Sequence, residues 1–291
     1  MYNNKYFDRT SNRFLDLELD GYPLEEWERS FGSAKFAKHP KGFYVFLPPD
    51  KLLANDEYAE ADPYNTEQNL NSQFQRRRMD LTFLLAREAI ANMDSINKIE
   101  VLDLGCGQGH ITEYLGKELG SANFSGLDYS ISAIEYARDN YPDIDFAVGD
   151  ASQTPYANDY FDLVICNNLL EHVSDPLLLL NQIKLICKPG GYVIITTPSR
   201  FRFENLLRII RGKPVKLMSS SHVTEYSVGQ VIELLNHGGF QLIRHLSRPI
   251  AKGNLFVKSL RELFRFYLSL IGSHHELEST VFYLAKMNSH G

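Results

Sequence analysis

The stretch "VLDLGCGQGH", residues Val101–His110, decides the fold. It joins a short apolar segment to three glycines at alternate positions, and a pattern with Ile111, Tyr114 and Leu115 on one helical face follows it. A strand, a glycine loop and a helix in this order are typical of the first unit of a nucleotide-binding sheet. The stretch therefore predicts a ligand-binding loop at the carboxyl end of a buried strand.

Strands and helices alternate from Ile99 to Thr197, and several strands read as continuous apolar runs. Such runs separated by helices are typical of a parallel sheet that is covered on both faces. Beyond this zone, Ser227 and Gln230 fit a capping box at a helix start, and two further strands follow with a helix at 254–272 between them. We expect an α/β, doubly wound, Rossmann-like sheet with helices on both faces.

Two domains are predicted, without internal repeats. Residues 1–95 form an aromatic-rich accessory or lid region that ends in a helix, and residues 96–291 form the ligand-binding domain with a helical insertion at about 251–275. The insertion helix is interpreted as core-facing, or alternatively as a lid or docking face for an anionic or lipid-linked acceptor. Its apolar positions oppose a basic side that holds Lys258, Arg261 and Arg265; these apolar positions are Phe256, Leu260, Leu263, Phe264, Tyr267 and Ile271.

Composition narrows the class of protein. The 291 residues are 44% hydrophobic and 23% charged, with a net charge of −6, which argues against general nucleic-acid binding. The three cysteines Cys106, Cys166 and Cys187 are scattered, which predicts reduced thiols rather than disulfides. No signal-peptide pattern and no run of ~18 apolar residues is present. We expect a cytoplasmic protein without a transmembrane segment.

The glycine loop departs from the dinucleotide and phosphate patterns. His110 stands where a dinucleotide fingerprint would carry its third glycine, and no G-K-[ST] follows. Asp103 would oppose a pyrophosphate but would attract an ammonium group. Asp128 ends the next strand, where a carboxylate can bind ribose hydroxyls, and Asp150 ends the third, where an acceptor can meet an adenine amino group. Ammonium, ribose and adenine without phosphate describe S-adenosylmethionine.

Five motifs stand in one order: "VLDLGCGQG", "GLDYS", "VGDAS", "FDLVICNNLLEHV" and "CKPGG". On these motifs the chain resembles class I S-adenosylmethionine-dependent methyltransferases over about residues 76–245. The resemblance implies a seven-stranded, mostly parallel sheet whose last strand, near Ser279–Lys286, is antiparallel. It implies S-adenosylmethionine as cofactor, although for Arg78 a solvated basic face is an equal alternative. The implied cofactor residues are Asp103, Gly105, Cys106, Gly107, Gly109, Asp128, Tyr129, Asp150, Ala151, Asn167 and Arg78.

Polar groups that could face a methyl acceptor follow the fourth strand in "NNLLEHVSDP". We interpret His172 as a general base oriented by Glu171, with His222 of "SSSHVTEYS" as a second catalytic histidine. A helix-capping pair and an exposed loop histidine are the structural alternatives. The layout around "TPSRFRFENLLR" is similar to bacterial methyltransferases of secondary metabolism and surface-glycan synthesis, which predicts O-methylation of a small molecule or sugar.

Other readings stay open. The acceptor could be RNA or protein, or the domain could bind S-adenosylmethionine without catalysis. Ubiquinone-type O-methyltransferases, which the chain resembles, can hold a divalent ion with an E-x-x-E-H segment and a later histidine. Here Glu171, His172 and His222 match, but Asn168 replaces the first glutamate. We therefore predict catalysis without a metal, and a site made by these three residues, better suited to zinc or iron than to magnesium, is the alternative.

Overall fold

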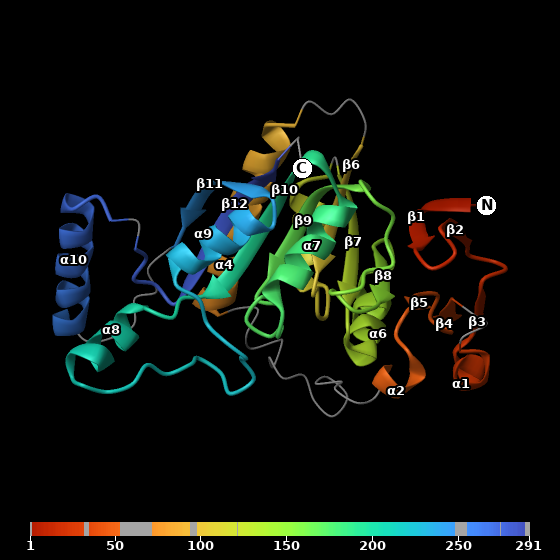
Figure 1. Cartoon of the computed structure of the whole chain (residues 1–291), viewed down its shortest axis with the longest axis horizontal. Helices are drawn as coiled ribbons and strands as arrows, with labels where there is room; N and C mark the ends of the chain where they lie inside the picture. Colours follow the sequence, from red (N-terminus) through yellow and green to blue (C-terminus); the bar gives the residue numbers. More distant parts are fainter. Residues whose placement is uncertain are drawn as a thin grey trace.

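The computed structural model describes residues 2–31, 35–52, 72–93, 98–120, 122–247, 255–273 and 275–288. Its main feature is a sheet in the order β11-β12-β10-β9-β6-β7-β8-β5-β4-β3 (Figure 1). The strands of the central part are β6 (Ile99–Leu104), β7 (Ala122–Asp128), β8 (Asp145–Val148), β9 (Phe161–Asn167), β10 (Cys187–Pro198), β11 (Phe240–Leu246) and β12 (Thr280–Met287). The helices that follow them are α5 (His110–Glu118), α6 (Ile131–Asn140), α7 (Pro176–Ile186), α8 (Phe203–Ile210), α9 (Val228–His237) and α10 (Leu255–Leu270).

The predicted seven-stranded, mostly parallel sheet is confirmed. Strands β8, β7, β6, β9 and β10 pair in parallel, and β12 pairs antiparallel with both β10 and β11. The antiparallel strand begins at Thr280, one residue from the expected start. Because the parallel strands share one direction, their carboxyl ends meet at one edge, which is where the loop after β6 lies.

The N-terminal region lengthens this sheet to ten strands. Strand β5 (Tyr44–Val45) pairs in parallel with β8, and β4 (Phe36–Lys38) and β3 (Gly21–Pro23) follow it. These strands are two or three residues long, too short for an alternating sequence pattern to reveal them. Strands β1 (Tyr2–Asp8) and β2 (Arg13–Asp16) form a separate small sheet, and the short elements η1 (Leu24–Glu26), α1 (Trp27–Ser30) and α2 (Pro49–Leu52) complete the region. A domain boundary near residue 95 stays a prediction.

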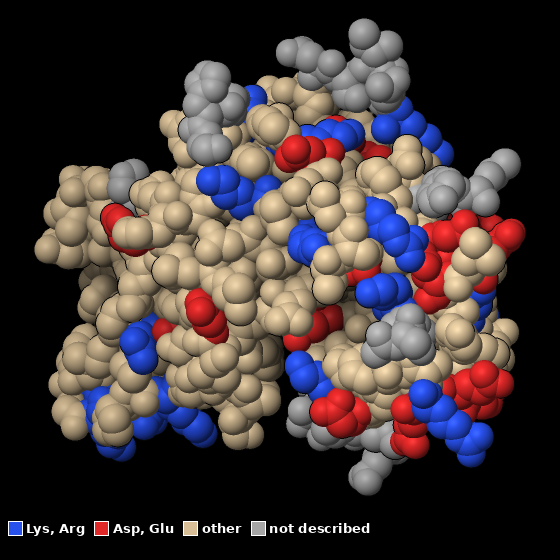
Figure 2. Space-filling model, turned by 45° about the vertical axis from the view of Figure 1, so that its right-hand side comes forward, with Lys and Arg blue, Asp and Glu red and all other residues tan. Residues whose placement is uncertain are grey.

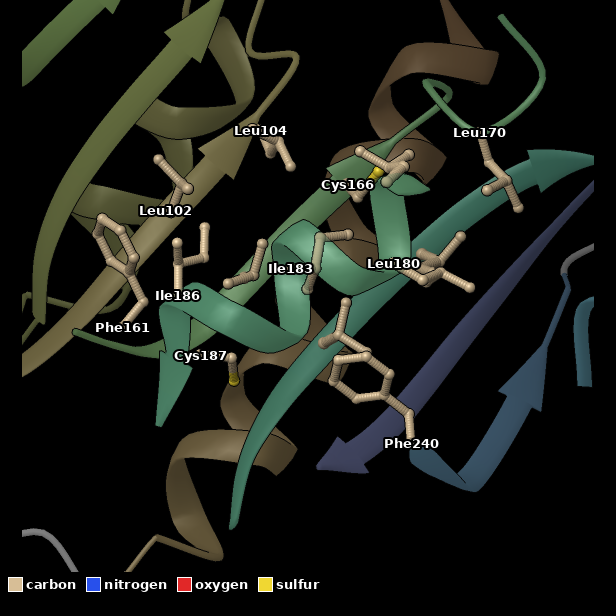
Figure 3. Close-up of a cluster of buried hydrophobic side chains, with 14 of the residues drawn as sticks. Leu102, Leu104, Phe161, Cys166, Leu170, Leu180, Ile183, Ile186, Cys187 and Phe240 are labelled. Carbon is tan, nitrogen blue, oxygen red and sulfur yellow. The ribbon is translucent and has the colours of Figure 1, made fainter. Parts of the chain in front are cut away.

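Helices bury apolar side chains on both faces of the sheet. On one face α7 contributes four buried side chains, and Figure 3 shows Ile183 and Ile186 of this helix in one cluster with Phe161 and Phe240. On the other face α4 (Gln73–Ala91) packs Leu81 and others against the sheet. Each fully buried Leu or Ile contributes about 1.5–3 kcal/mol. The predicted capping box is present at Ser227 and Gln230. Ser130 also caps α6, because its side chain accepts from the N–H of Ala133.

Helix α10 corrects the prediction of a core-facing helix. Leu263 and Tyr267 are exposed, whereas Arg261, expected on the outer side, is buried and paired with Glu204 and Glu278. The prediction failed because the partners of Arg261 come from distant segments. The side chain of Phe256 lies outside the described residues.

A lid over the acceptor cleft, formed by the N-terminal region or by α10, stays a prediction. Strand β3 and strand β11, to which α10 is connected, lie at opposite ends of the sheet (Figure 1). Within the described part of the chain, no helix combines the length and apolar character needed to cross a membrane.

Candidate active site

The glycine loop turns sharply after β6. Gly105 and Gly109 have φ angles of +79° and +77°, a region that side chains with a Cβ rarely adopt. A Cβ at Gly109 would also lie 2.7 Å from Cζ of Phe146. These glycines therefore bring bare backbone to the carboxyl edge of the sheet, where a ligand can approach closely.

Two carboxylates mark the ends of the next strands. Asp128 ends β7 and accepts the Gly107 N–H through Oδ2 at 2.7 Å and the Ser130 N–H through Oδ1 at 2.9 Å, so it ties the loop to its own strand. Asp150, just beyond β8, accepts the Ser152 N–H at 2.8 Å. Asp150 also raises the pKa of Tyr129, after the larger effect of burial. The structure thus gathers Asp128, Tyr129 and Asp150, with Ala151 next in the chain, at one edge.

A further residue, not anticipated from the sequence, reaches this edge from the N-terminal region. Nζ of Lys51 in α2 lies 3.9 Å from Oδ2 of Asp150. No local pattern pointed to it, because the contact depends on β5 joining β8.

Asp103 and Asn167 carry unused hydrogen-bonding capacity. Asp103 is buried, its Oδ2 accepts the Thr112 hydroxyl at 2.7 Å, and its Oδ1 has no hydrogen-bond partner among the described residues. Burial raises the pKa of Asp103 to about 6, while Thr112 and Arg78 act in the opposite direction. Both side-chain amide atoms of the buried Asn167 also lack partners among the described residues. Arg78 donates to the Asn167 carbonyl at 3.4 Å, so the structure brings this predicted residue to the same place.

The side chain of Cys106 in the glycine loop is uncharged. Burial, with Asp128 and Asp103 next in effect, raises the pKa of its thiol well above the ordinary value. The thiol therefore stays protonated near neutral pH.

A second group of polar residues follows β9. Glu171 is buried and accepts from Asn168 Nδ2 through Oε1 at 2.9 Å, whereas its Oε2 has no hydrogen-bond partner among the described residues. The rings of His172 and His222 meet edge to face with centroids 5.0 Å apart. Potential ligand atoms of Glu171, His172 and His222 all lie within 4.8 Å of one another. The structure therefore brings the three predicted catalytic residues together.

The backbone explains this meeting of two distant segments. The N–H groups of Val223 and Thr224 donate to the Glu171 carbonyl at 2.9 Å and 3.3 Å. His222 is therefore fixed beside the helical turn that carries His172.

Asn168 explains why a carboxylate is missing from this cluster. Its φ of +52° lies in the left-handed region, which asparagine tolerates better than most residues. Both polar atoms of its amide are hydrogen-bonded, because Nδ2 donates to Glu171 and Oδ1 accepts the Thr196 hydroxyl at 3.2 Å. The cluster consequently offers two imidazoles and one carboxylate.

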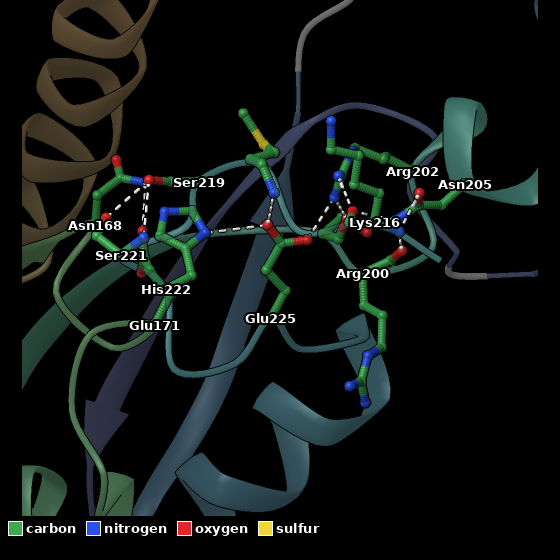
Figure 4. Close-up of polar contacts among 12 residues, drawn as sticks. Asn168, Glu171, Arg200, Arg202, Asn205, Lys216, Ser219, Ser221, His222 and Glu225 are labelled. Atoms are coloured by element: carbon green, nitrogen blue, oxygen red, sulfur yellow. Dashed lines mark hydrogen bonds and ion pairs between the residues drawn. The ribbon is translucent and has the colours of Figure 1, made fainter. Parts of the chain in front are cut away.

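Glu225 and Arg202 were not identified from the sequence. Glu225 is buried and accepts from His222 Nδ1 at 3.0 Å, from Arg202 and from the N–H of Met218 (Figure 4). Because a carboxylate only accepts, Nδ1 of His222 carries a hydrogen, and in the neutral ring Nε2 is then the acceptor. Figure 4 shows Glu225 and Asn168 on opposite sides of the His222 ring. The H-x-x-E spacing in "HVTEY" was the one available signal.

Comparison with known proteins decides the family. A family model described as "Methyltransferase domain" matches residues 96–256. The chain belongs to this family. Together with the fold and motifs, the match makes it a class I S-adenosylmethionine-dependent methyltransferase, and its cofactor is S-adenosylmethionine.

Relatives and solved structures agree with this assignment. A protein of Mycolicibacterium smegmatis named as an S-adenosylmethionine-dependent methyltransferase is 26% identical over 49% of this chain and 52% of its own length. A ubiquinone biosynthesis O-methyltransferase of Hydrogenovibrio crunogenus is 33% identical over 44% of this chain and 54% of its own. The magnesium protoporphyrin IX methyltransferase of Synechocystis, solved with bound SAH, has a TM-score of 0.52 at 14% identity over 75% of this chain and 88% of its own, which shows a common fold. The methyltransferase spans about half the length of the curated relatives it matches.

Buried polar atoms at the carboxyl edge of the sheet fit this cofactor. Oδ1 of Asp103 and the amide of Asn167 have no hydrogen-bond partner in the described ranges, and burying such groups without a partner costs free energy. A ligand with an ammonium and a carboxylate group would supply an acceptor and donors for them. The bare backbone at Gly105 and the carboxylate of Asp128 suit the rest of such a ligand.

Proposed function

We propose that this methyltransferase transfers a methyl group to a hydroxyl of a small molecule or sugar, with His172 as the general base. The main support is the cluster of Glu171, His172 and His222. It begins a few residues after Asn167, which lies at the carboxyl edge of the sheet. The relatives named as ubiquinone O-methyltransferases support hydroxyl acceptors.

Residues of the methyltransferase hold the cofactor in this proposal. When bound, S-adenosylmethionine supplies an electrophilic methyl group on a sulfonium centre. Asp103, Asn167 and Arg78 bind its amino-acid end, because an ammonium complements Asp103 and a guanidinium complements a carboxylate. Asp128 binds the ribose, and Asp150 with Ala151 binds the adenine.

The histidine cluster accepts the proton that the acceptor hydroxyl loses. Transfer of a methyl group to a hydroxyl requires the loss of its proton, which the imidazole of His172 accepts. Glu171, with a carboxylate oxygen within 4.8 Å of a ring nitrogen of His172, orients this ring and stabilises its charged form. His222, whose tautomer is set by Glu225, offers Nε2 as a second acceptor for the substrate hydroxyl. A positioned base contributes roughly 10²–10⁴-fold to the rate.

A panel of acceptors tests the proposal. Release of S-adenosylhomocysteine is measured with matched alcohols, phenols, sugars and amines. Turnover of hydroxyl compounds that falls in His172→Ala but not in His237→Ala, a control at an exposed histidine of α9, is the expected result. Turnover of amines alone would overturn O-methylation.

A divalent ion at the cluster is a second candidate. The proximity of ligand atoms from Glu171, His172 and His222 favours it, since two histidines and one glutamate form a common catalytic zinc set. There the ion would acidify an acceptor hydroxyl. Loss of turnover on chelation, restored by zinc or iron, would support this candidate against the metal-free base.

Two rival functions have their own signatures. A methyltransferase of RNA or protein would show salt-dependent affinity for the polymer. A non-catalytic module would bind the cofactor and show no turnover on any acceptor class.

A further inference from the structure

Helices α8 and α10 present an apolar surface that no described part of the chain covers. Of the eighteen exposed large apolar side chains among the described residues, eight belong to α8, α10 and the residue that follows α10. Leu255, Phe266 and Leu270 are 80%, 62% and 69% exposed. We call this surface the α8–α10 face, and it comprises Ile209, Ile210, Leu255, Leu263, Phe266, Tyr267, Leu270 and Ile271.

The apolar stripe of α10 points away from its packed side. At about 100° per residue, the exposed side chains of α10 itself fall within roughly 120° of one another. The packed side holds Arg261, which pairs with Glu204 and Glu278, and Phe264, whose ring lies 6.0 Å from that of Phe203. One side of α10 therefore packs against α8 and the segment before β12, and its apolar side faces away from them. Figure 1 shows α10 at the outer edge of the molecule. Exposed apolar side chains gathered on one side of a helix are typical of an interaction site.

Charge identifies the kind of partner. Residues 205–224 contain no Asp or Glu, although the whole chain has a net charge of −6. Four cations in this stretch, Arg208, Arg211, Lys213 and Lys216, lie on α8 and the loop after it. In Figure 2, Lys and Arg gather at the lower left beneath a largely uncharged surface. Glu204 of α8 and Glu262 of α10 are exposed, but they pair with Arg261 and Arg265. Apolar side chains beside a stretch of cations that contains no acidic residue fit an anionic amphiphilic surface.

The same stretch leads into the active site. The Lys216 carbonyl accepts from Arg202, and the Met218 N–H donates to Glu225, which also accepts from His222. The cationic loop is therefore continuous with the wall that carries His222. A surface bound by the α8–α10 face would lie on the acceptor side of the methyltransferase.

We propose that the α8–α10 face docks on an anionic lipid bilayer and takes an amphiphilic acceptor from it. The apolar side chains of α10 enter the headgroup boundary, and the cations of residues 208–216 contact lipid phosphates. This inference deepens the proposed function and rests on it for the acceptor alone. A second copy of the chain fits the face less well, because a two-fold pairing would bring two cationic stretches together.

Vesicle co-sedimentation of the full chain tests the docking. We expect binding to phosphatidylcholine vesicles that contain phosphatidylglycerol, little binding to phosphatidylcholine alone, and weaker binding at high salt. The double variants Phe266→Ser/Leu270→Ser and Arg211→Glu/Lys213→Glu should each lower vesicle binding by about tenfold or more. Matched controls at exposed positions elsewhere, Leu19→Ser and Lys117→Glu, should bind as the wild type does.

Light scattering and turnover separate the remaining outcomes. A dimer that dissociates in Phe266→Ser/Leu270→Ser, without vesicle binding, would replace the bilayer with a second copy. Failure to bind either kind of vesicle, or equal binding by all variants, would overturn the proposal. Turnover of a water-soluble hydroxyl acceptor should persist in both double variants. If the wild type binds vesicles but methylates no hydroxyl acceptor, the docking stands and the proposed chemistry fails.

Discussion

Two buried carboxylates, one on the cofactor side and one on the acceptor side, differ in how completely they are paired. Asp103 pairs one oxygen with Thr112 and leaves the other without a hydrogen-bond partner in the described part of the chain. Glu225 uses both oxygens, on Arg202 and His222 among others. An unsatisfied buried group costs free energy, whereas a satisfied one supports the fold. Incomplete pairing therefore indicates a position that a ligand completes, and full pairing indicates architecture.

Glu171 shows that pairing, rather than location, makes this distinction. It lies on the acceptor side near Glu225, yet its Oε2 lacks a partner among the described residues. We expect changes at incompletely paired groups and their neighbours to alter binding or turnover. Changes at fully paired groups should alter the free energy of unfolding.

The largest effect on turnover is expected at His172. Replacement His172→Ala removes the proposed base beside Glu171, so turnover of a hydroxyl acceptor should fall by roughly 10²–10⁴-fold. Cofactor affinity, measured by calorimetry, should stay nearly unchanged. His237→Ala is the control, and near-wild-type turnover of His172→Ala would exclude both the base and the metal candidate.

The largest effect on stability is expected at Glu225. Replacement Glu225→Gln leaves the buried Arg202 without its counter-charge, and breaking such a pair lowers the free energy of unfolding by about 3–5 kcal/mol. Denaturant titration measures the change, with Glu233→Gln on the exposed side of α9 as the control. A loss of turnover without any loss of stability would place Glu225 among the ligand-completed groups and break the comparison.

An intermediate effect on binding is expected at Asp128. Loss of its carboxylate in Asp128→Ala should weaken S-adenosylmethionine binding by about 1–3 kcal/mol, since the group is proposed to bind ribose and also holds the Gly107 N–H. Calorimetry should show negligible binding of NAD to the wild type. Measurable NAD binding, or unchanged affinity in Asp128→Ala, would contradict the assigned cofactor contact.

The cofactor half was predictable because its signals are local. Each of Asp103, Asp128 and Asp150 stands at or next to the end of an apolar strand, and parallel strands bring their carboxyl ends to one edge. The loop conformation follows from Gly105 and Gly109, whose positive φ angles few other residues accept. Strand ends and glycines can be identified from the sequence alone, without knowledge of any distant contact.

The acceptor half was only partly predictable because its contacts join distant segments. His222 was a candidate, but the role of its partner Glu225 could not be predicted, because Glu225 also binds Arg202 from a distant segment. Arg261 looked like an exposed cation until Glu204 and Glu278 proved to surround it. Charged residues have no sequence periodicity that reveals such buried pairs.

The smallest effect is a pH dependence of cofactor affinity, and it tests Oδ1 of Asp103, which has no hydrogen-bond partner among the residues that the structure describes. Burial raises the pKa of this carboxyl to about 6, so the apo form holds a proton below that pH. The cofactor ammonium prefers the ionised carboxylate, and binding must then expel the proton. Affinity should therefore fall by up to about tenfold per pH unit below pH 6 and level off above it.

The variant Asp103→Asn isolates this carboxyl. Its cofactor affinity should be weaker at pH 7 and should lose the dependence below pH 6. The free energy of unfolding of Asp103→Asn should rise, whereas that of Glu225→Gln should fall. The raised pKa of Asp103 stabilises the folded wild type at low pH, and this contribution is lost as the pH rises toward 6. At neutral pH the apo form of Asp103→Asn should therefore unfold less readily than the wild type. A destabilised Asp103→Asn at that pH would show that Asp103 is architectural, like Glu225, and would remove the distinction between the two carboxylates.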